Sequence, residues 1–325
     1  MFIGLSGAVY AKEASFNVAV KGAVKQPLYL NQEDLAKFQQ LTVRLNEITQ
    51  DGKYNGVFIY TGIPLRTILN LAVIEKKNAE FNKLHDLAVV VRNKDGKQVV
   101  LSWGEIFYRN PSDLILALSA RPLIPHKSCN SCHKPGEFEG RFNQLERAIG
   151  FPKLIAVNDF YTDRAIEDVV SIEVVDLKPA LKVAKPVSLF SPDFIITGAV
   201  SKPLTITDIA NLPQTYVTTK SVGDGIGYHG IKKYSGISLT SLLEKAGVTK
   251  SPDAVCLVTA PDGYRSLLSF GELFLSPAGS RILIADRMSG EPLTKDGRFL
   301  LLITDDQAAD RWVKAVNQIE IINLQ

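Results

Sequence analysis

The chain has 325 residues, of which 46% are hydrophobic, and its 37 basic and 34 acidic side chains give a net charge of +3 at pH 7. This length favours two domains, and the composition is ordinary for a soluble globular protein. No block of like charges marks a nucleic-acid or anionic-membrane surface, and no apolar run reaches the roughly 18 residues that a membrane helix needs.

The first eleven residues, MFIGLSGAVYA, are small and apolar. They are typical of the end of a secretory signal peptide with cleavage after Ala11, although a basic region in front of the apolar stretch is missing. The alternative is an apolar first strand. The signal-peptide interpretation predicts an exported, periplasmic protein.

An internal repeat follows, which predicts two similar domains. The first copy opens with VKGAVKQPL at residues 20–28 and the second with ITGAVSKPL at residues 196–204. YTGIPL at 60–65 and YSGISL at 234–239 then lead into apolar residues with helical spacing. These residues are Leu65, Ile68, Leu69 and Ala72 in the first copy and Leu239, Leu242, Leu243 and Ala246 in the second.

Further along both copies, strands are predicted at residues 87–91 and 255–258, each followed by an Asp-Gly turn that indicates a hairpin. The sequences SWGE at 102–105 and SFGE at 269–272 have the capping-box pattern that begins a helix. Each copy closes with an Asp-Arg pair before a final strand. We interpret Arg164 and Arg311 of these pairs as partners of nearby aspartates that pin the last turn to the sheet, and an anion site is the alternative.

The spacing between the copies locates an insertion. The offset is 167 residues at the capping boxes and 147 at the closing Asp-Arg pairs, so the first copy carries 20 extra residues between them. The sequence predicts a first domain at 16–177 with an insertion at about 119–150, an extended linker at 178–192 and a second domain at 193–325. Because loops on rigid scaffolds often carry function, the insertion is a candidate site.

The insertion contains Cys129-x-x-Cys132-His133, the pattern that attaches a c-type haem. In such a site two thiols bond to the porphyrin and the histidine, here His133, becomes an axial ligand of the iron. A zinc site, a Cys129–Cys132 disulfide and free thiols are the alternatives. The candidates for the second axial position, which can also stay open, are His126, His229 and Met288.

Several motifs of the second copy occur in a fixed order. They are Tyr-x-Gly-Ile-x-Leu at 234–239, Asp-Gly-Tyr-Arg at 262–265, Gly-Glu-Leu at 271–273 and Arg-Trp-Val-Lys at 311–314, before a final Ile-Glu-Ile strand. Their order resembles the oxidoreductase molybdopterin-binding domain, the catalytic fold of the sulfite oxidase family. The resemblance covers most of residues 194–324 and is weaker over 16–177. It implies a strand-rich α+β fold, as two tandem sulfite-oxidase-like domains related by approximate two-fold symmetry, and molybdopterin as a cofactor.

The sequence also departs from that family. Catalytic members hold molybdenum through a cysteine thiolate, which the resemblance places at residues 42–47 or 216–221, and neither stretch contains a cysteine. Cys256 lies in an apolar strand and is expected in the core. His85, in front of a predicted strand, is expected on the surface. We therefore expect the fold to be kept without thiolate-bound molybdenum.

Together these patterns predict an exported electron-transfer protein that carries a c-type haem on a duplicated sulfite-oxidase-type scaffold and serves a redox partner protein. One alternative is an oxidoreductase that binds molybdopterin without a cysteine ligand. Another is a non-catalytic binding module in which the Cys/His loop holds zinc or a disulfide. The sequence identifies no catalytic residue.

Overall fold

The computed structural model of the chain describes residues 16–77, 79–123, 148–179, 189–223, 227–294 and 297–324. The haem-type motif with Cys129, Cys132 and His133 lies outside the described residues, as do His126, the predicted signal peptide at 1–11 and most of the predicted linker. Among the described residues, no helix is long and apolar enough to cross a membrane.

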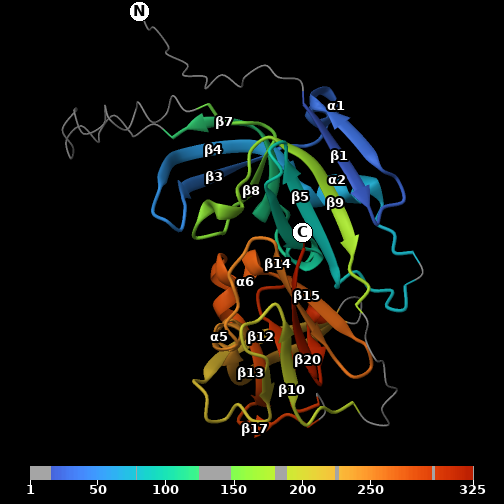
Figure 1. The fold of residues 1–325 in the computed structure, drawn as a ribbon, viewed down its shortest axis with the longest axis vertical. Coiled ribbons are helices and arrows are strands. Elements are labelled where there is room, and N and C mark those ends of the chain that lie inside the picture. Colours follow the sequence, from blue (N-terminus) through green and yellow to red (C-terminus); the bar gives the residue numbers. More distant parts are fainter. Residues whose placement is uncertain are drawn as a thin grey trace, which may run out of the picture.

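The first half of the chain forms the upper part of the molecule in Figure 1, coloured blue to green. Its elements are β1 (Asn17–Gly22), β2 (Leu28–Asn31), α1 (Gln32–Ala36), β3 (Leu41–Ile48), β4 (Tyr54–Pro64), α2 (Leu65–Ala72), β5 (Leu87–Asn93), β6 (Gln98–Ser102), α3 (Trp103–Phe107), η1 (Pro111–Asp113), β7 (Leu114–Pro122), β8 (Lys153–Ala156), η4 (Thr162–Arg164) and β9 (Val169–Asp176).

The second half forms the lower part, coloured yellow to red (Figure 1). Its elements are β10 (Phe194–Gly198), β11 (Leu204–Ile206), β12 (Thr215–Gly223), β13 (Gly227–Ser238), α5 (Leu239–Lys245), β14 (Ala254–Thr259), β15 (Arg265–Ser269), α6 (Phe270–Phe274), η5 (Pro277–Arg281), β16 (Ile282–Met288), β17 (Glu291–Pro292), β18 (Leu300–Ile303), η6 (Ala309–Arg311), β19 (Val313–Lys314) and β20 (Gln318–Asn323).

Each half contains one mixed sheet and one antiparallel sheet within the described residues. The mixed sheets have the orders β2-β1-β9-β5-β6 and β11-β10-β20-β14-β15. In both, the first and last strands of the half pair in parallel, β1 with β9 and β10 with β20. The other sheets have the orders β3-β4-β7-β8 and β12-β13-β16-β18-β19. The expected strand-rich α+β fold is therefore confirmed, and the same strand order occurs in both halves.

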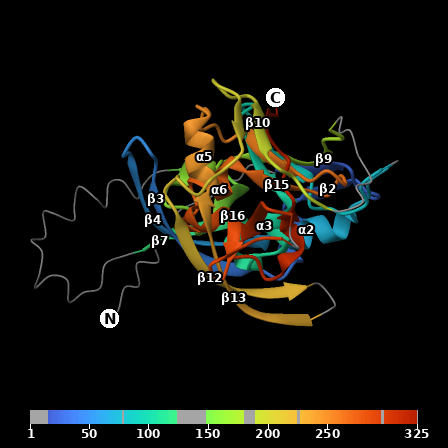
Figure 2. The same ribbon diagram turned by 90° about the horizontal axis from the view of Figure 1, so that it is seen from below.

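The predicted local elements are confirmed. The Asp-Gly turns close the β5–β6 and β14–β15 hairpins, and the apolar faces of α2 and α5 are buried. Ser102 and Ser269 cap α3 and α6 in full capping boxes. Figure 2 shows β12 and β13 as a long hairpin that projects from the body of the molecule.

The two halves pack against each other through the edge strands of their mixed sheets. Ala88, Val90 and Val100 form one buried cluster with Val255, Leu257 and Leu267. Two matched backbone hydrogen bonds cross the same contact, from Leu267 N to His85 O at 2.8 Å and from Val100 N to Pro252 O at 2.9 Å. This arrangement buries apolar strands that would otherwise face water, so each half completes the core of the other.

Candidate functional site

A network of buried charges lies where α3 and α6 meet between the halves. Arg164 donates two hydrogen bonds to Asp159, at 2.7 and 2.8 Å, and Arg311 donates two to Asp306, at 2.6 and 2.7 Å. The predicted arginine–aspartate pairing is confirmed. Such forked pairs hold both planar groups in one orientation.

The sequence did not predict the glutamates that complete this network. Arg164 also donates to Glu105 at 2.7 Å, and Arg311 donates to Glu272 at 3.1 Å. The two arginines reach across because a glycine faces each of them: a Cβ on Gly271 would lie 2.4 Å from Arg164 Cζ. The sequence signal was present in the matching Gly-Glu pairs of the two capping boxes, but their contact depends on how the halves pack.

The network is not symmetric in charge. Arg109 places its guanidinium 3.1 Å from the Glu272 carboxylate, and Ser276 holds the matching position in the second half. Burial raises the pKa of Glu105, and the Arg164 charge offsets only part of that effect. Burial acts on Glu272 too, but Arg311 and Arg109 together outweigh it and hold its pKa below the usual value. Because each of the three arginines in this network already pairs with a carboxylate, we assign the network a structural role.

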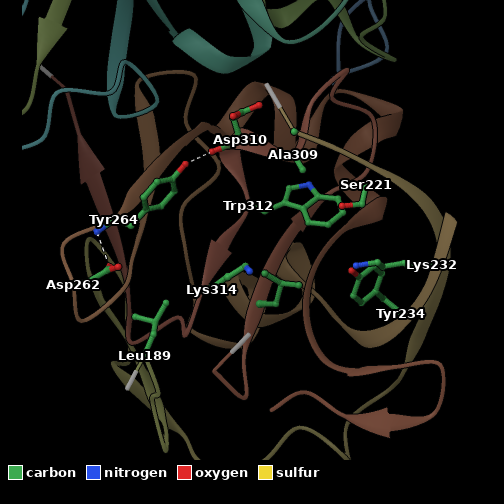
Figure 3. Close-up of a pocket in the computed structure, with 12 residues that line it drawn as sticks. Leu189, Ser221, Lys232, Tyr234, Asp262, Tyr264, Ala309, Asp310, Trp312 and Lys314 are labelled. Atoms are coloured by element: carbon green, nitrogen blue, oxygen red, sulfur yellow. Dashed lines mark hydrogen bonds between the residues drawn. The ribbon is translucent and has the colours of Figure 1, made fainter. Parts of the chain in front are cut away.

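A separate pocket of about 370 Å³ opens in the second half (Figure 3). Its volume lies in the range of small-molecule sites. The residues that line it are Leu189, Ser221, Gly223, Lys232, Tyr234, Asp262, Tyr264, Leu300, Ala309, Asp310, Trp312 and Lys314. The wall thus combines two lysines, two aspartates and three aromatic side chains, drawn from the β12–β13 hairpin, the β14–β15 turn and the segment after η6.

The aromatic walls are held in place from behind. The Trp312 indole donates to Ile303 O at 3.2 Å, and its ring packs edge to face against Tyr234, with ring centroids 5.9 Å apart. The Tyr264 hydroxyl donates to Asp310 O, so it points along the rim toward η6 (Figure 3). Aromatic rings fixed in this way present flat apolar surfaces to a ligand.

The corresponding position in the first half is filled. The two halves can be aligned on their strand pairing, because Gly62 pairs with Ala117 in the first half as Gly236 pairs with Ala285 in the second. This alignment makes three positions near the pocket equivalent. In these, Tyr60 corresponds to Tyr234, Glu47 to Ser221 and Lys153 to Leu300.

The three side chains of the first half form a buried ion cluster in place of a pocket. Lys153 Nζ lies 2.5 Å from Glu47 Oε1 and 3.0 Å from the Tyr60 hydroxyl, which itself donates to Glu47. Lys153 and Glu47 are almost fully buried. A second pocket at this place is therefore closed by charged side chains that satisfy one another.

The structure places the predicted site residues in different surroundings. His229, a candidate for the second axial position, is an exposed residue of strand β13. Met288 ends β16, pairs with Tyr234 and packs on the core beside the pocket. Cys256 is fully buried, as predicted, and burial raises the pKa of its thiol well above the usual value. The described part of the chain contains no cluster of three His, Cys, Asp or Glu side chains that could hold a metal ion.

Ser221 is the last residue of the stretch in which the resemblance places a metal-ligating cysteine. Its side chain borders the pocket and is largely buried. At this place the pocket wall presents a hydroxyl group and not a thiol.

His85 corrects a prediction. It was expected on the surface, but only 4% of it is exposed. Its Nε2 lies 2.7 Å from the Tyr108 hydroxyl and its Nδ1 lies 3.3 Å from the hydroxyl of Tyr264, across the contact between the halves. Burial, and then the positive charges of Arg311, Lys83 and Lys76, lower the pKa of His85 to about 4. No local pattern predicts this burial, because Tyr108 and Tyr264 lie far from His85 in the sequence.

Comparisons with known proteins bear on the second half. No curated protein matches the sequence. Among solved structures, the chain is similar to the sulfane dehydrogenase SoxCD from Paracoccus pantotrophus, with 12% identity, a TM-score of 0.34 and coverage of 95% of this chain and 78% of that chain. Residues 181–325, the part of the chain that contains the pocket, match the model of the oxidoreductase molybdopterin-binding domain family.

Proposed function

We propose that the chain is a redox protein whose second half binds a molybdopterin-type cofactor in the pocket between β12–β13, the β14–β15 turn and η6. One observation carries this proposal. The pocket opens in the half that matches the molybdopterin-binding family model, and its wall combines lysines with fixed aromatic rings.

The residues of the pocket fit the organic part of such a cofactor. Lys232 and Lys314 supply positive charge for its phosphate, and the rings of Trp312 and Tyr234 suit a flat pterin. The fit to a thiolate-bound metal is absent, since the stretch 216–221, in which the family resemblance expects the cysteine, has none and Cys256 is buried in the core. When bound, a molybdenum form of the cofactor supplies two-electron redox chemistry. Its metal would have no cysteine ligand from the described residues.

We further propose that the halves are tandem copies of one domain, at 16–177 and 193–325, related by approximate two-fold symmetry and joined by a linker at 178–192. The equal strand orders and the matched hydrogen bonds between the halves support this. The copies then differ at the pocket position, which the first half fills with the Lys153 cluster. Ligand binding is thereby confined to the second half.

The insertion in the first half gives this scaffold a second redox group in our proposal. Cys129 and Cys132 would attach a c-type haem with His133 on the iron, and the haem would pass electrons to a partner protein outside the cytoplasm. The spacing of the motif supports this, as does the insertion's absence from the second copy. A zinc site or a disulfide in a non-catalytic binding module is the competing function.

Cofactor analysis of the purified chain tests the proposal. The chain is expressed in a bacterium that makes molybdopterin and matures c-type haem. Released pterin is measured by fluorescence, metals by mass spectrometry and haem by visible absorption. We expect about one pterin and one covalent haem per chain, with the haem lost and the pterin kept in a Cys129→Ser, Cys132→Ser double variant. A chain without pterin overturns the pocket assignment, and one zinc without haem supports the binding module.

A further inference from the structure

A segment of the first half crosses to the second half beside the pocket. Twelve residues separate Ile74 from Leu87, whereas five separate Val248 from Ala254 at the matching place in the second half. The longer connection ends in residues 79–86, which we call the crossing segment. It has no counterpart of equal length in the other half, so its contacts are not a by-product of the shared fold.

Ion pairs fasten the crossing segment at both sides. Asp86 lies 2.7 Å from Lys76 of its own half and 2.7 Å from Arg265 of the other half. Lys76 also donates to Phe81 O at 2.7 Å. The Arg265 guanidinium lies 4.7 Å from the centre of the Phe81 ring. Because Lys76, Asp86 and Arg265 are nearly buried, these pairs hold the segment more firmly than surface pairs would.

Two aromatic groups of the segment contact Tyr264, a wall of the pocket. The Phe81 ring packs edge to face on the Tyr264 ring, with centroids 5.5 Å apart. The His85 ring lies 6.0 Å away, also edge to face. The phenol of Tyr264 is thus held on one side by the first half while its other side borders the pocket.

The hydrogen bonds around His85 have one consistent direction. The Tyr264 hydroxyl donates its proton to Asp310 O, so toward His85 it can only accept. His85 must then carry its single proton on Nδ1 and accept at Nε2 from the Tyr108 hydroxyl, 2.7 Å away. These hydrogen bonds run from Tyr108 through His85 and Tyr264 to the Asp310 carbonyl oxygen, and the two hydroxyls and the imidazole each donate their proton.

We propose that the crossing segment is a positioning element for the pocket of the second half, in which His85 holds the Tyr264 phenol and thereby fixes one wall of the ligand site. This inference rests on the proposed function. Through this contact, the ligand affinity of the second half depends on a residue of the first half. The close packing of the two halves thus has a role at the ligand site. His85 is a positioning residue, since it reaches the ligand only through Tyr264.

A double-mutant cycle on ligand affinity tests the proposal, with a pterin monophosphate as the probe and calorimetry as the measurement. We expect His85→Ala and Tyr264→Phe each to weaken binding roughly tenfold, which corresponds to loss of about one hydrogen bond. In the Tyr264→Phe background, His85→Ala should cause no further loss. His85→Gln should recover most of the affinity, because its amide can donate to Tyr264 and accept from Tyr108. Additive losses in the cycle overturn the proposal.

Nuclear magnetic resonance gives a second readout that needs no ligand. With ring-labelled tyrosine, the signal that disappears in Tyr264→Phe is assigned to Tyr264, and it should shift in His85→Ala. Nitrogen chemical shifts of the His85 ring at pH 7 should show the proton on Nδ1. If the unaltered chain does not bind the probe, the proposed function fails, and these two signals still decide the positioning role. An unshifted Tyr264 signal or a proton on Nε2 contradicts it.

Discussion

Ser102, the capping residue of α3 in the first half, donates a 2.7 Å hydrogen bond to Glu272, the capping-box glutamate of α6 in the second half. The exchange is mutual, because Ser269 donates to Glu105 at 2.6 Å. Each helix start therefore depends on an acceptor from the other half. Both serines and both glutamates are fully or nearly fully buried, so separating the halves would leave several polar groups without partners.

Neutralising Glu272 should destabilise the whole chain. Glu272→Gln removes the charge that faces both Arg311 and Arg109, and breaking a buried ion pair costs about 3–5 kcal/mol. Glu105→Gln should cost less, because Glu105 pairs with one arginine, Arg164, whereas Glu272 faces two. Urea denaturation followed by circular dichroism measures both free energies of unfolding.

The matched control for these variants is Glu244→Gln. Glu244 pairs with Lys250 on the surface, where about half of each side chain is exposed, so its loss should change stability by less than about 1 kcal/mol. Equal costs for Glu272→Gln and Glu244→Gln would contradict the role of the buried network.

The ion cluster that fills the first half gives a second prediction. Lys153→Met should destabilise the chain by about 3–5 kcal/mol, because it leaves the Glu47 carboxylate buried beside Tyr60 without its cation. Adding Glu47→Gln should restore part of the loss, since neither charge then remains. Thermal denaturation of the single and double variants measures this coupling. A double variant that is less stable than Lys153→Met would show that the two charges do not compensate each other.

Acidification should destabilise the folded chain partly through His85. The pKa of this residue is about 4 in the folded state, below its ordinary value of 6.5. The unfolded chain therefore takes up the proton first as the pH falls below 6.5, and folding stability decreases by roughly 3 kcal/mol on going from pH 7 to pH 4. His85→Gln lacks this contribution. The difference in free energy of unfolding between the unaltered chain and His85→Gln should therefore narrow from pH 7 to pH 4. A pH-independent difference would mean that His85 titrates normally.

The Cys256 thiol should be unreactive in the folded chain. It is fully buried, and burial raises its pKa well above the usual value, so little thiolate is present to attack a disulfide reagent. In the Cys129→Ser, Cys132→Ser background, we expect no reaction with an aromatic disulfide reagent until urea unfolds the protein. Rapid labelling of one thiol in the native state would place Cys256 at an accessible site instead.

Local signals predicted much of the fold. Ser102 and Ser269 could be assigned as caps because a capping box spans only four residues, and the Asp-Gly turns and helix faces are equally local. The repeat predicted that Arg164 and Arg311 would have equivalent roles. The signal peptide and the haem motif lie outside the described residues, as does most of the linker, so all three stay predictions.

Long-range packing accounts for what the sequence did not predict. Lys153 and Glu47 are more than one hundred residues apart, so their pairing follows from strand register rather than from any motif. Glu47 and Ser221 hold matching positions of the predicted repeat, but the sequence did not predict that one closes a pocket and the other borders it. His85 was misassigned because its burial depends on Tyr264 and Tyr108, which approach it only when the halves pack.

Pterin content after a charge change in the pocket tests most directly whether the pocket of the second half binds the cofactor. The pocket variant, Lys232→Gln with Lys314→Gln, removes both lysines of the wall. The control variant, Lys220→Gln with Lys233→Gln, removes the same amount of charge from exposed positions on the β12–β13 hairpin. We expect pterin per chain to fall at least fivefold in the pocket variant and to stay unchanged in the control, with both variants folded. Equal pterin content in the two variants would contradict the assignment of this pocket.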